Sequence, residues 1–420
     1  MTIAPRHGLW KTLGFAVLLV VLAPAIATET TVGTGEHFKT HQAAAALPVP
    51  GDDAAAATPP IRPDPIPPPQ APAPQAGQTA DSPLTTPEAM VGNKRATGVT
   101  PQLDPAPAPV PRPGATNLLE ACWDPQDLRG RPGERKIRNH LTPDHRPPDR
   151  QLPRMHPFAM PQVPARSLRS VIPFGGEKLI ALTFDLCEQA DEVTGYDGDL
   201  VDTLRAQGVK ATFYAGGKWM HSHPARTLQL MADPLFELGN HAWTHGNLRV
   251  LQGEEMVNQI RWTQAEYERL REQLLALPCA APLAATEGPL IPRLPETFRF
   301  PYGTCNSESL QAVADAGLYP VQWSIVTGDP AKGQTAAQIV KTVMAQLKPG
   351  SIVVAHGNGR GWHTAEAMRI LVPALHQQGY RLVTVSELLQ SGSPVTVEQC
   401  YEVREGDNRR YDRLFGKGTQ

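Results

Sequence analysis

The sequence lacks the features that would suit it to nucleic acid or to several crossings of a membrane. Its 39 Lys and Arg residues nearly balance its 41 Asp and Glu residues, so neither a strongly basic nor a strongly acidic surface is expected. Beyond residue 27, no stretch is long and apolar enough to cross a bilayer. A nucleic-acid partner and a stable membrane span in the mature protein are therefore not predicted.

The first residues have the pattern of a secretory signal peptide. Arg6 and Lys11 form a basic start, residues 13–22 form an apolar run, and a small-residue cleavage motif ends at Ala27. The apolar run is short for a membrane span and Pro24 follows it, which favours cleavage over an uncleaved anchor. We predict a signal peptide at 1–27. The protein is then exported to the periplasm or the extracellular space, with association to the envelope left open.

Proline is abundant, at 44 residues, and its uneven placement divides the chain. Residues 28–115 are rich in Pro and Ala and show no apolar periodicity, which predicts a disordered linker. Residues 116–171 are polar and basic and are predicted to form an irregular lead-in. The catalytic domain is expected at 172–390, and residues 391–420 are predicted to be a tail.

The part from Lys178 onward alternates between two kinds of apolar pattern. A buried strand is predicted at 179–184, a helix at 197–207 and the next strand at 211–214, and the alternation continues to a strand at 381–384. Repeated β–α units predict a parallel sheet or barrel.

Polar residues follow the ends of several predicted strands. They are Asp185, His241, Tyr302, Asp329 and His356. In a barrel of parallel strands, functional residues gather at the carboxyl ends of the strands. The sequence therefore predicts a single site at that edge.

His241 and His245 stand four residues apart in the segment His-Ala-Trp-Thr-His. On a helical turn, residues with this spacing share one face, close enough to hold one metal ion. Together with a carboxylate at Asp185, a cation at Arg299 and an acid at His356, they form the set that a metal-assisted hydrolase needs.

These segments resemble those of the polysaccharide deacetylase family, the carbohydrate esterases with a NodB-homology domain. The resemblance covers about 172–390 and follows the family's order of motifs, namely 181–185 (ALTFD), 209–214 (VKATFY), 241–245 (HAWTH), 299–303 (RFPYG), 350–356 (GSIVVAH) and 379–388 (GYRLVTVSEL). It implies an α/β fold, a distorted (β/α) barrel of the NodB type. It also implies removal of N-acetyl groups from sugars with a divalent metal, most often zinc, with cobalt or nickel as alternatives.

The first motif departs from the family pattern, which usually has two adjacent aspartates, a base and a metal ligand. Here the second position is Leu186, which cannot bind a metal. Glu188 or Asp197 could supply the third ligand, or Asp185 could itself bind the metal. A weak site of two histidines and water is a further alternative.

The resemblance also suggests roles for the remaining residues. Asp185 would act as the base, and Arg299 would orient it and keep it ionised. The backbone N–H of Tyr302 would stabilise the oxyanion. Asp329 would orient His356 and raise its pKa, so that His356 can protonate the leaving amine.

The chain has five cysteines, an odd number, so at least one is unpaired within the chain. If the segments around Cys187 and Cys305 line one site, the two can form a disulfide. A pair of metal-binding thiolates is the competing interpretation, disfavoured because no CxxC spacing accompanies it. A second disulfide, between Cys122 and Cys400, would join the flanks of the domain.

Three functions follow from these patterns. The first is a metal-dependent hydrolase that deacetylates a cell-envelope or extracellular polysaccharide. The second is a glycan-binding module without activity, because Leu186 replaces a ligand. The third is a metal amidohydrolase acting on a small amide. The retained base, acid and arginine favour the enzyme, and the predicted signal and linker favour a large glycan. The glycan, the metal and the oligomeric state stay open.

Overall fold

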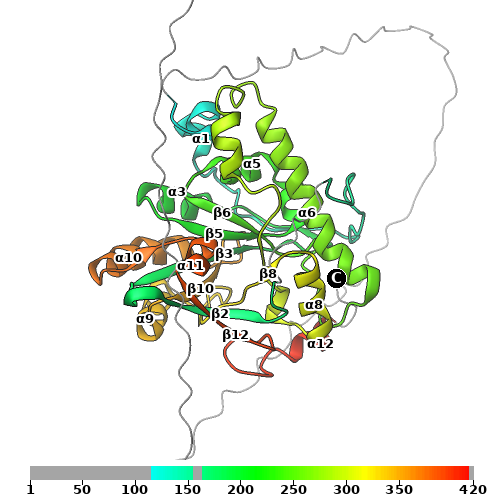
Figure 1. Ribbon diagram of the computed structural model, residues 1–420, viewed down its shortest axis with the longest axis vertical. Coiled ribbons are helices and arrows are strands. Elements are labelled where there is room, and N and C mark those ends of the chain that lie inside the picture. Colours follow the sequence, from blue (N-terminus) through cyan, green and yellow to red (C-terminus); the bar gives the residue numbers. More distant parts are fainter. Residues whose placement is uncertain (1–114, 155–162, 416–420) are drawn as a thin grey trace, which may run out of the picture. The chain divides into compact units, whose positions relative to one another are not determined.

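The computed structural model describes residues 115–154 and 163–415 (Figure 1). The predicted signal peptide, and the predicted linker apart from Ala115, lie outside the described residues. Within the described ranges, no helix is both long and apolar enough to cross a membrane.

The centre of the domain is a ten-stranded sheet with the order β12-β2-β10-β3-β5-β6-β7-β8, to which β9 and β11 add beside β10 and β3. The main strands are β2 (Ser167–Pro173), β3 (Leu179–Leu186), β5 (Ala211–Ala215), β6 (Phe236–Asn240), β10 (Ser351–His356) and β12 (Gly392–Val397). The short strands of this sheet are β7 (Thr297–Phe298), β8 (Tyr319–Pro320), β9 (Ile325–Val326) and β11 (Arg381–Leu382). A separate two-stranded sheet pairs β1 (Arg138–Asn139) with β4 (Glu192–Val193).

The sheet curls until its two sides meet. Beyond β8, Val321 forms a parallel bridge with Leu168 of β2, and the Gln322 N–H donates to the Leu168 carbonyl at 2.8 Å. Strands β10, β3, β5, β6, β7 and β8 run parallel, so their carboxyl ends lie at one edge. The structure thus confirms the predicted α/β fold, a distorted barrel that places the strand ends together.

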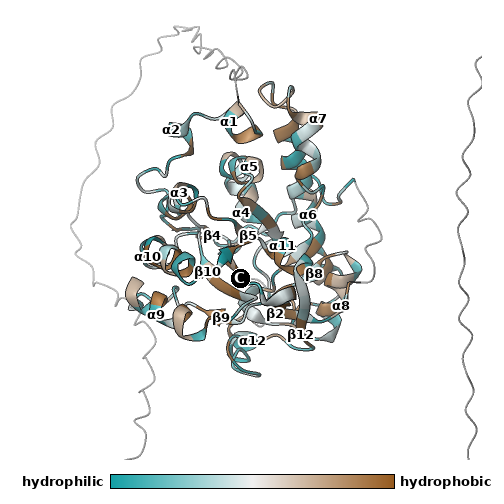
Figure 2. Ribbon diagram, turned by 60° about the vertical axis from the view of Figure 1, so that its left-hand side comes forward, coloured by the Kyte–Doolittle hydropathy of each residue, from teal (hydrophilic) through white to brown (hydrophobic). Residues whose placement is uncertain are grey.

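Helices surround the sheet, and the one at Val385–Gln390 packs with the inward-facing residues Leu179 and Ala181 of β3. The helices are α1 (Leu118–Cys122), α2 (Pro125–Leu128), α3 (Gly198–Ala206), α4 (Gly217–Ser222), α5 (Pro224–Ala232), α6 (Gly253–Leu275), α7 (Ala284–Glu287), α8 (Ser307–Asp315), α9 (Ala336–Gln346), α10 (Thr364–Gln377), α11 (Val385–Gln390) and α12 (Arg410–Leu414), with 3-10 turns at Phe174–Gly176, Gly288–Leu290 and Pro301–Gly303. The same helices carry hydrophilic and hydrophobic faces (Figure 2), as expected where one side packs on a sheet.

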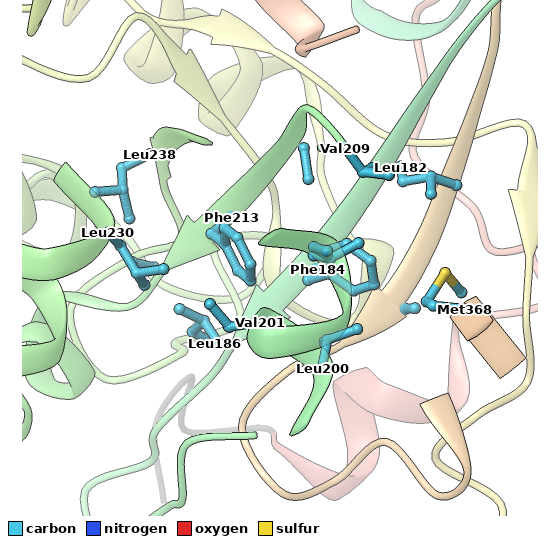
Figure 3. Close-up of a cluster of buried hydrophobic side chains, with 14 of the residues drawn as sticks. Leu182, Phe184, Leu186, Leu200, Val201, Val209, Phe213, Leu230, Leu238 and Met368 are labelled. Atoms are coloured by element: carbon cyan, nitrogen blue, oxygen red, sulfur yellow. The ribbon is translucent and has the colours of Figure 1, made fainter. Parts of the chain in front are cut away.

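The largest apolar cluster lies between the sheet and the helices (Figure 3). From β3 it receives Leu182, Phe184 and Leu186, which pack with residues of α3, β5 and α10. Successive side chains of a strand point to opposite faces, so Thr183 and Asp185 point to the other side, into the barrel. Leu186, only 1% exposed, is therefore a core residue.

The sheet extends past both predicted ends of the domain. Strand β2 begins at Ser167, inside the predicted lead-in, and β12 lies in the predicted tail. These two strands pair antiparallel along most of their length. Neither segment shows a clear apolar periodicity in the sequence. The burial of the side chains in these strands depends on contacts with segments far away in the chain.

The predicted disulfides are wrong. The structure pairs Cys122 with Cys279 and Cys305 with Cys400, and it leaves Cys187 as a free, buried thiol. The Cys187–Cys305 prediction rested on the expectation that both segments line one site. It failed because the side chain of Cys305 turns toward the C-terminal segment, where it pairs with Cys400. The sequence does not reveal the position of that segment.

The packing of Leu186 predicts that the family's second aspartate cannot simply be restored. Leu186→Asp places a carboxylate among apolar side chains without a partner, and we expect it to lower the free energy of unfolding by about 3–5 kcal/mol. Urea unfolding of the purified protein measures this. The control is Leu186→Met, which conserves volume and should cost less than about 1.5 kcal/mol. Equal stability of Leu186→Asp and the parent chain would show that residue 186 does not face the core.

Candidate active site

A buried ion pair lies at the carboxyl end of β3. Nη1 of Arg299 donates to Asp185 Oδ1 at 2.9 Å and to Thr183 Oγ1 at 2.6 Å. The guanidinium is fully buried and lies 4.0 Å from the ring centre of Tyr214. The predicted contact between Arg299 and Asp185 is present, and it fixes one carboxylate oxygen while the other faces His241.

The two histidines come from a loop and not from a helical turn. Ala242 and His245 have positive φ angles of 64° and 55°, which a helix does not allow. The carbonyls of Ala242 and Trp243 accept hydrogen bonds from the first N–H groups of α4 instead of from the loop itself. The helical prediction for 241–245 is wrong, yet the two imidazole rings still lie close, with centroids 4.8 Å apart.

The histidine nitrogens are available to a ligand. Nδ1 of His241 lies 2.8 Å from the carbonyl of Arg299, and because a carbonyl only accepts, this nitrogen carries the proton. Nε2 of His241 is then free to bind, and it lies 3.7 Å from Asp185 Oδ2. Both Nε2 of His241 and Nδ1 of His245 are buried without a hydrogen-bond partner. Buried polar atoms normally have a partner, so this pair fits a missing ion.

The third member of the cluster is Cys187. Its Sγ and one nitrogen from each of His241 and His245 all lie within 4.8 Å of one another. The carbonyl of Cys187 accepts hydrogen bonds from Asn358 Nδ2 at 2.6 Å and Thr194 Oγ1 at 2.8 Å, which fix the backbone at this point. A thiolate and two imidazoles form a donor set suited to a divalent transition metal.

The pKa shifts at the three residues differ in direction. Although burial opposes protonation, the charge of Asp185 raises the pKa of His241, whereas burial lowers the pKa of His245. Burial alone would raise the pKa of the Cys187 thiol, but the neighbouring histidines, His245 foremost, hold that pKa well below its usual value.

The structure does not bring Glu188 and Asp197 to the histidines. Glu188 is fully buried on the far side of the strand end, where its carboxylate contacts Ser222 at 2.5 Å and Lys218 at 3.2 Å. Asp197 caps the N-terminus of α3 and pairs with Arg135 at 3.3 Å. Both carboxylates are engaged elsewhere and do not supply the third metal ligand.

His356 and Asp329 form a second pair, in which Asp329 is buried and His356 is partly buried. Nδ1 of His356 lies 2.9 Å from Asp329 Oδ1, and the backbone N–H of His356 donates to Oδ2 at 2.7 Å. The hydroxyls of Thr327 and Thr364 also donate to this carboxylate. Although burial opposes protonation, the charge of Asp329 raises the pKa of His356 well above its ordinary value. Asp329 thus favours the protonated form of this imidazole, the form that can donate a proton.

Tyr302 lies between the histidine loop and the end of the described chain. Its φ is 58°. The centroid of its ring lies 4.4 Å from that of His245 and 4.1 Å from that of Phe415, on which the ring stacks. Of the four non-glycine residues with positive φ in the described ranges, three belong to the loops of this site. Such conformations cost about 1–3 kcal/mol each and persist where surrounding contacts enforce them.

Residues 400–415, here called the C-terminal strap, supply those contacts. The Cys305–Cys400 disulfide ties the strap to the segment after Tyr302, and Asn408 donates to the carbonyl of Gly303. Arg249, just beyond the histidine loop, pairs with Asp412 at 2.8 Å. The strap thus packs on the Tyr302 loop, although its sequence gave no sign of this.

The predictions from the sequence did not group Cys187 alone with His241 and His245, and they did not include the contact of Asn358 with the Cys187 carbonyl. A signal for Cys187 was available, because it stands two residues after Asp185, and side chains at that spacing share one side of a strand. The same spacing was available for Asn358, which stands two residues after His356. No comparable local signal exists for Thr364 or Phe415.

Comparison with known proteins gives a consistent family. The family model described as polysaccharide deacetylase matches residues 175–321. A peptidoglycan-N-acetylglucosamine deacetylase of Bacillus cereus is 31% identical over 219 residues, which are 51% of this chain and 89% of that protein. A bifunctional xylanase/deacetylase of Pseudobutyrivibrio xylanivorans is 29% identical over 214 residues, which cover 51% of this chain and 31% of that longer protein.

A solved structure with a similar name also matches part of this chain. The crystal structure of the Bc1960 peptidoglycan N-acetylglucosamine deacetylase is 26% identical, with a TM-score of 0.44, and the match covers 54% of this chain and 93% of that one.

The two histidine nitrogens without hydrogen-bond partners predict that metal binding depends on His241. We expect about one zinc, cobalt or nickel per chain after loading, and a loss of most of it in His241→Ala, because a ligand is removed. Plasma mass spectrometry after gel filtration measures the content. His363→Ala is the control, since its ring is half exposed and pairs with Glu366. Circular dichroism checks that each variant is folded. Equal metal in His241→Ala and the parent would place the metal elsewhere.

Proposed function

The chain belongs to the polysaccharide deacetylase family, and from that premise we propose that it is a metal-dependent hydrolase that removes N-acetyl groups from a cell-envelope or extracellular polysaccharide. One observation carries the proposal. An arginine-held carboxylate, Asp185, lies 3.7 Å from an orphaned nitrogen of His241, the arrangement of a base beside a metal ligand. Relatives named as peptidoglycan and chitooligosaccharide deacetylases indicate N-acetylglucosamine-containing glycans as the first substrates to test.

His241 and His245 would hold the divalent ion, zinc being the first candidate. Such an ion supplies Lewis acidity, which polarises the acetyl carbonyl and makes a water molecule more acidic. Asp185 then takes the proton of the attacking water, with its free oxygen directed toward the histidines. Arg299 holds the other oxygen and so orients the carboxylate.

Two further groups act on the tetrahedral intermediate and the leaving group. The backbone N–H of Tyr302 donates to the oxyanion, in a loop that the C-terminal strap holds in place. His356, protonated and oriented by Asp329, donates its proton to the departing amine. Base and acid come from adjacent strands, because Asp185 and His356 are paired in the register of β3 and β10.

The two alternative functions have less support. A binding module without chemistry does not need a buried carboxylate–arginine pair together with a histidine whose pKa is raised. A small-amide hydrolase does not need the signal-like N-terminus and the long Pro-rich segment. The observations thus favour a glycan deacetylase over both.

Export is part of the proposal. The first 27 residues have the pattern of a signal peptide, and disulfides such as the two in this domain form in oxidising compartments. A periplasmic or extracellular location, with contact to the envelope, suits a glycan substrate.

Asp185→Asn tests the base. We expect kcat for acetate release to fall by about 10²–10⁴-fold, because the amide cannot accept the proton of water. The assay follows acetate released from N-acetylglucosamine oligosaccharides and from peptidoglycan fragments. Asp199→Asn, an exposed residue of α3, is the matched control and should keep full activity. An Asp185→Asn protein with more than a tenth of the parent rate would remove Asp185 from the mechanism.

Asp329→Asn tests the acid through the pH dependence. Because His356 must be protonated to act, activity falls as the pH rises through its pKa, and Asp329 raises that pKa. Without the Asp329 charge, the alkaline limb of the kcat/KM profile should move to lower pH. Asp315→Asn, exposed on α8, is the control and should leave the profile in place. An alkaline limb that stays where it is in Asp329→Asn argues against His356 as the acid.

A further inference from the structure

We infer that Cys187 is the third protein ligand of the metal, so that this chain holds its ion with one thiolate and two imidazoles. The inference deepens the proposed function and rests on it for the presence of a catalytic metal. It assigns the role left open by Leu186 to a residue of a different chemical class, sulfur in place of oxygen. A preference for zinc or cobalt over magnesium, manganese and calcium follows from that change.

The geometry brings three donors to one point. Cys187 Sγ, His241 and His245 present ligand atoms within 4.8 Å of one another, and all three residues are buried. The two histidines, 1% and 8% exposed, each have a buried nitrogen without a hydrogen-bond partner. These two unpartnered nitrogens indicate that the thiol faces a ligand site rather than a closed core.

The direction of side chains after β3 explains why residue 187 takes this role and residue 186 does not. Leu186 packs in the apolar cluster beneath the helices, whereas Cys187 lies on the side of Asp185. Hydrogen bonds from Thr194 and Asn358 to the Cys187 carbonyl hold the backbone in that direction. The thiol is positioned before any ion binds, which favours binding.

A plain structural cysteine is the competing explanation, since free cysteines are often buried as small apolar residues. Cys187, however, belongs to none of the apolar clusters found among the described residues. It also has no sulfur partner, because the other four of the five cysteines form the two disulfides. Its sulfur lies instead beside the nitrogens of His241 and His245.

Cobalt substitution tests the inference directly, because a cobalt–thiolate bond has a charge-transfer absorption in the near ultraviolet. Cys187 is the only free thiol of the chain, so that absorption can be assigned to it. We expect the band in the Co²⁺-loaded full-length protein with its disulfides intact. We expect Cys187→Asp to lose the band while the visible cobalt bands remain, since a carboxylate replaces the sulfur.

Competition between metals adds a second readout that does not depend on activity. In Cys187→Ser, zinc affinity should fall by more than the ~10–100-fold typical of losing a residue that only orients a ligand. In Cys187→Asp, the preference should shift toward manganese, because a harder donor favours a harder ion. Chelator competition with Zn²⁺ and Mn²⁺ measures both shifts. His363→Ala is again the control.

The inference is overturned by a wild-type protein that binds cobalt without the near-ultraviolet band, or that takes up no cobalt at all. Unchanged zinc affinity in a folded Cys187→Ser protein also overturns it. The wild-type spectrum decides the question even where a variant fails to fold. Acetate release separates this test from the proposed function. If the cobalt protein shows the band but releases no acetate, Cys187 remains a metal ligand and the proposed deacetylase activity is rejected. If the cobalt protein releases acetate but shows no band, the proposed activity stands and Cys187 is not a ligand.

Discussion

The alternation of side chains at the end of β3 is the constraint on which the site depends. Asp185 points into the barrel, where Arg299 and Thr183 hold it, and Leu186 points outward into the apolar layer beneath the helices. Cys187 returns to the inner side and meets the two histidines. Base, core residue and proposed ligand are thus three consecutive residues whose functions follow from the direction of each side chain.

The surrounding groups give each functional side chain a second contact. Arg299 fixes Asp185, its own carbonyl accepts from His241, and Asp329 orients His356. Such contacts select one tautomer or one rotamer and hold the reacting groups in place without a cost at the moment of reaction. Because the barrel brings strand ends together, these contacts join segments that are 114 residues apart for Asp185 and Arg299, 58 for His241 and Arg299, and 27 for Asp329 and His356.

The C-terminal strap adds a constraint from outside the barrel. It ties the Tyr302 loop with a disulfide and with the aromatic ring of Phe415, so the left-handed conformation of Tyr302 is enforced from both sides. An oxidising compartment would form this link, and the same compartment is the one that the N-terminal residues predict. The predicted export and the geometry of the site are therefore connected through one disulfide.

The sequence by itself determined most of the strands and helices from 179 to 384, because apolar periodicity is a local property, but not the short helices α4 and α7 or the division of 319–326 into two strands. It also predicted that Asp185, His241, Tyr302, Asp329 and His356 share one edge, since parallel strands share their direction. Only the tertiary structure decided the partners of Cys305 and Cys400, the pairing of β12 with β2, and the loop conformation of 241–245. These depend on contacts between distant segments and on backbone angles, neither of which a local pattern encodes.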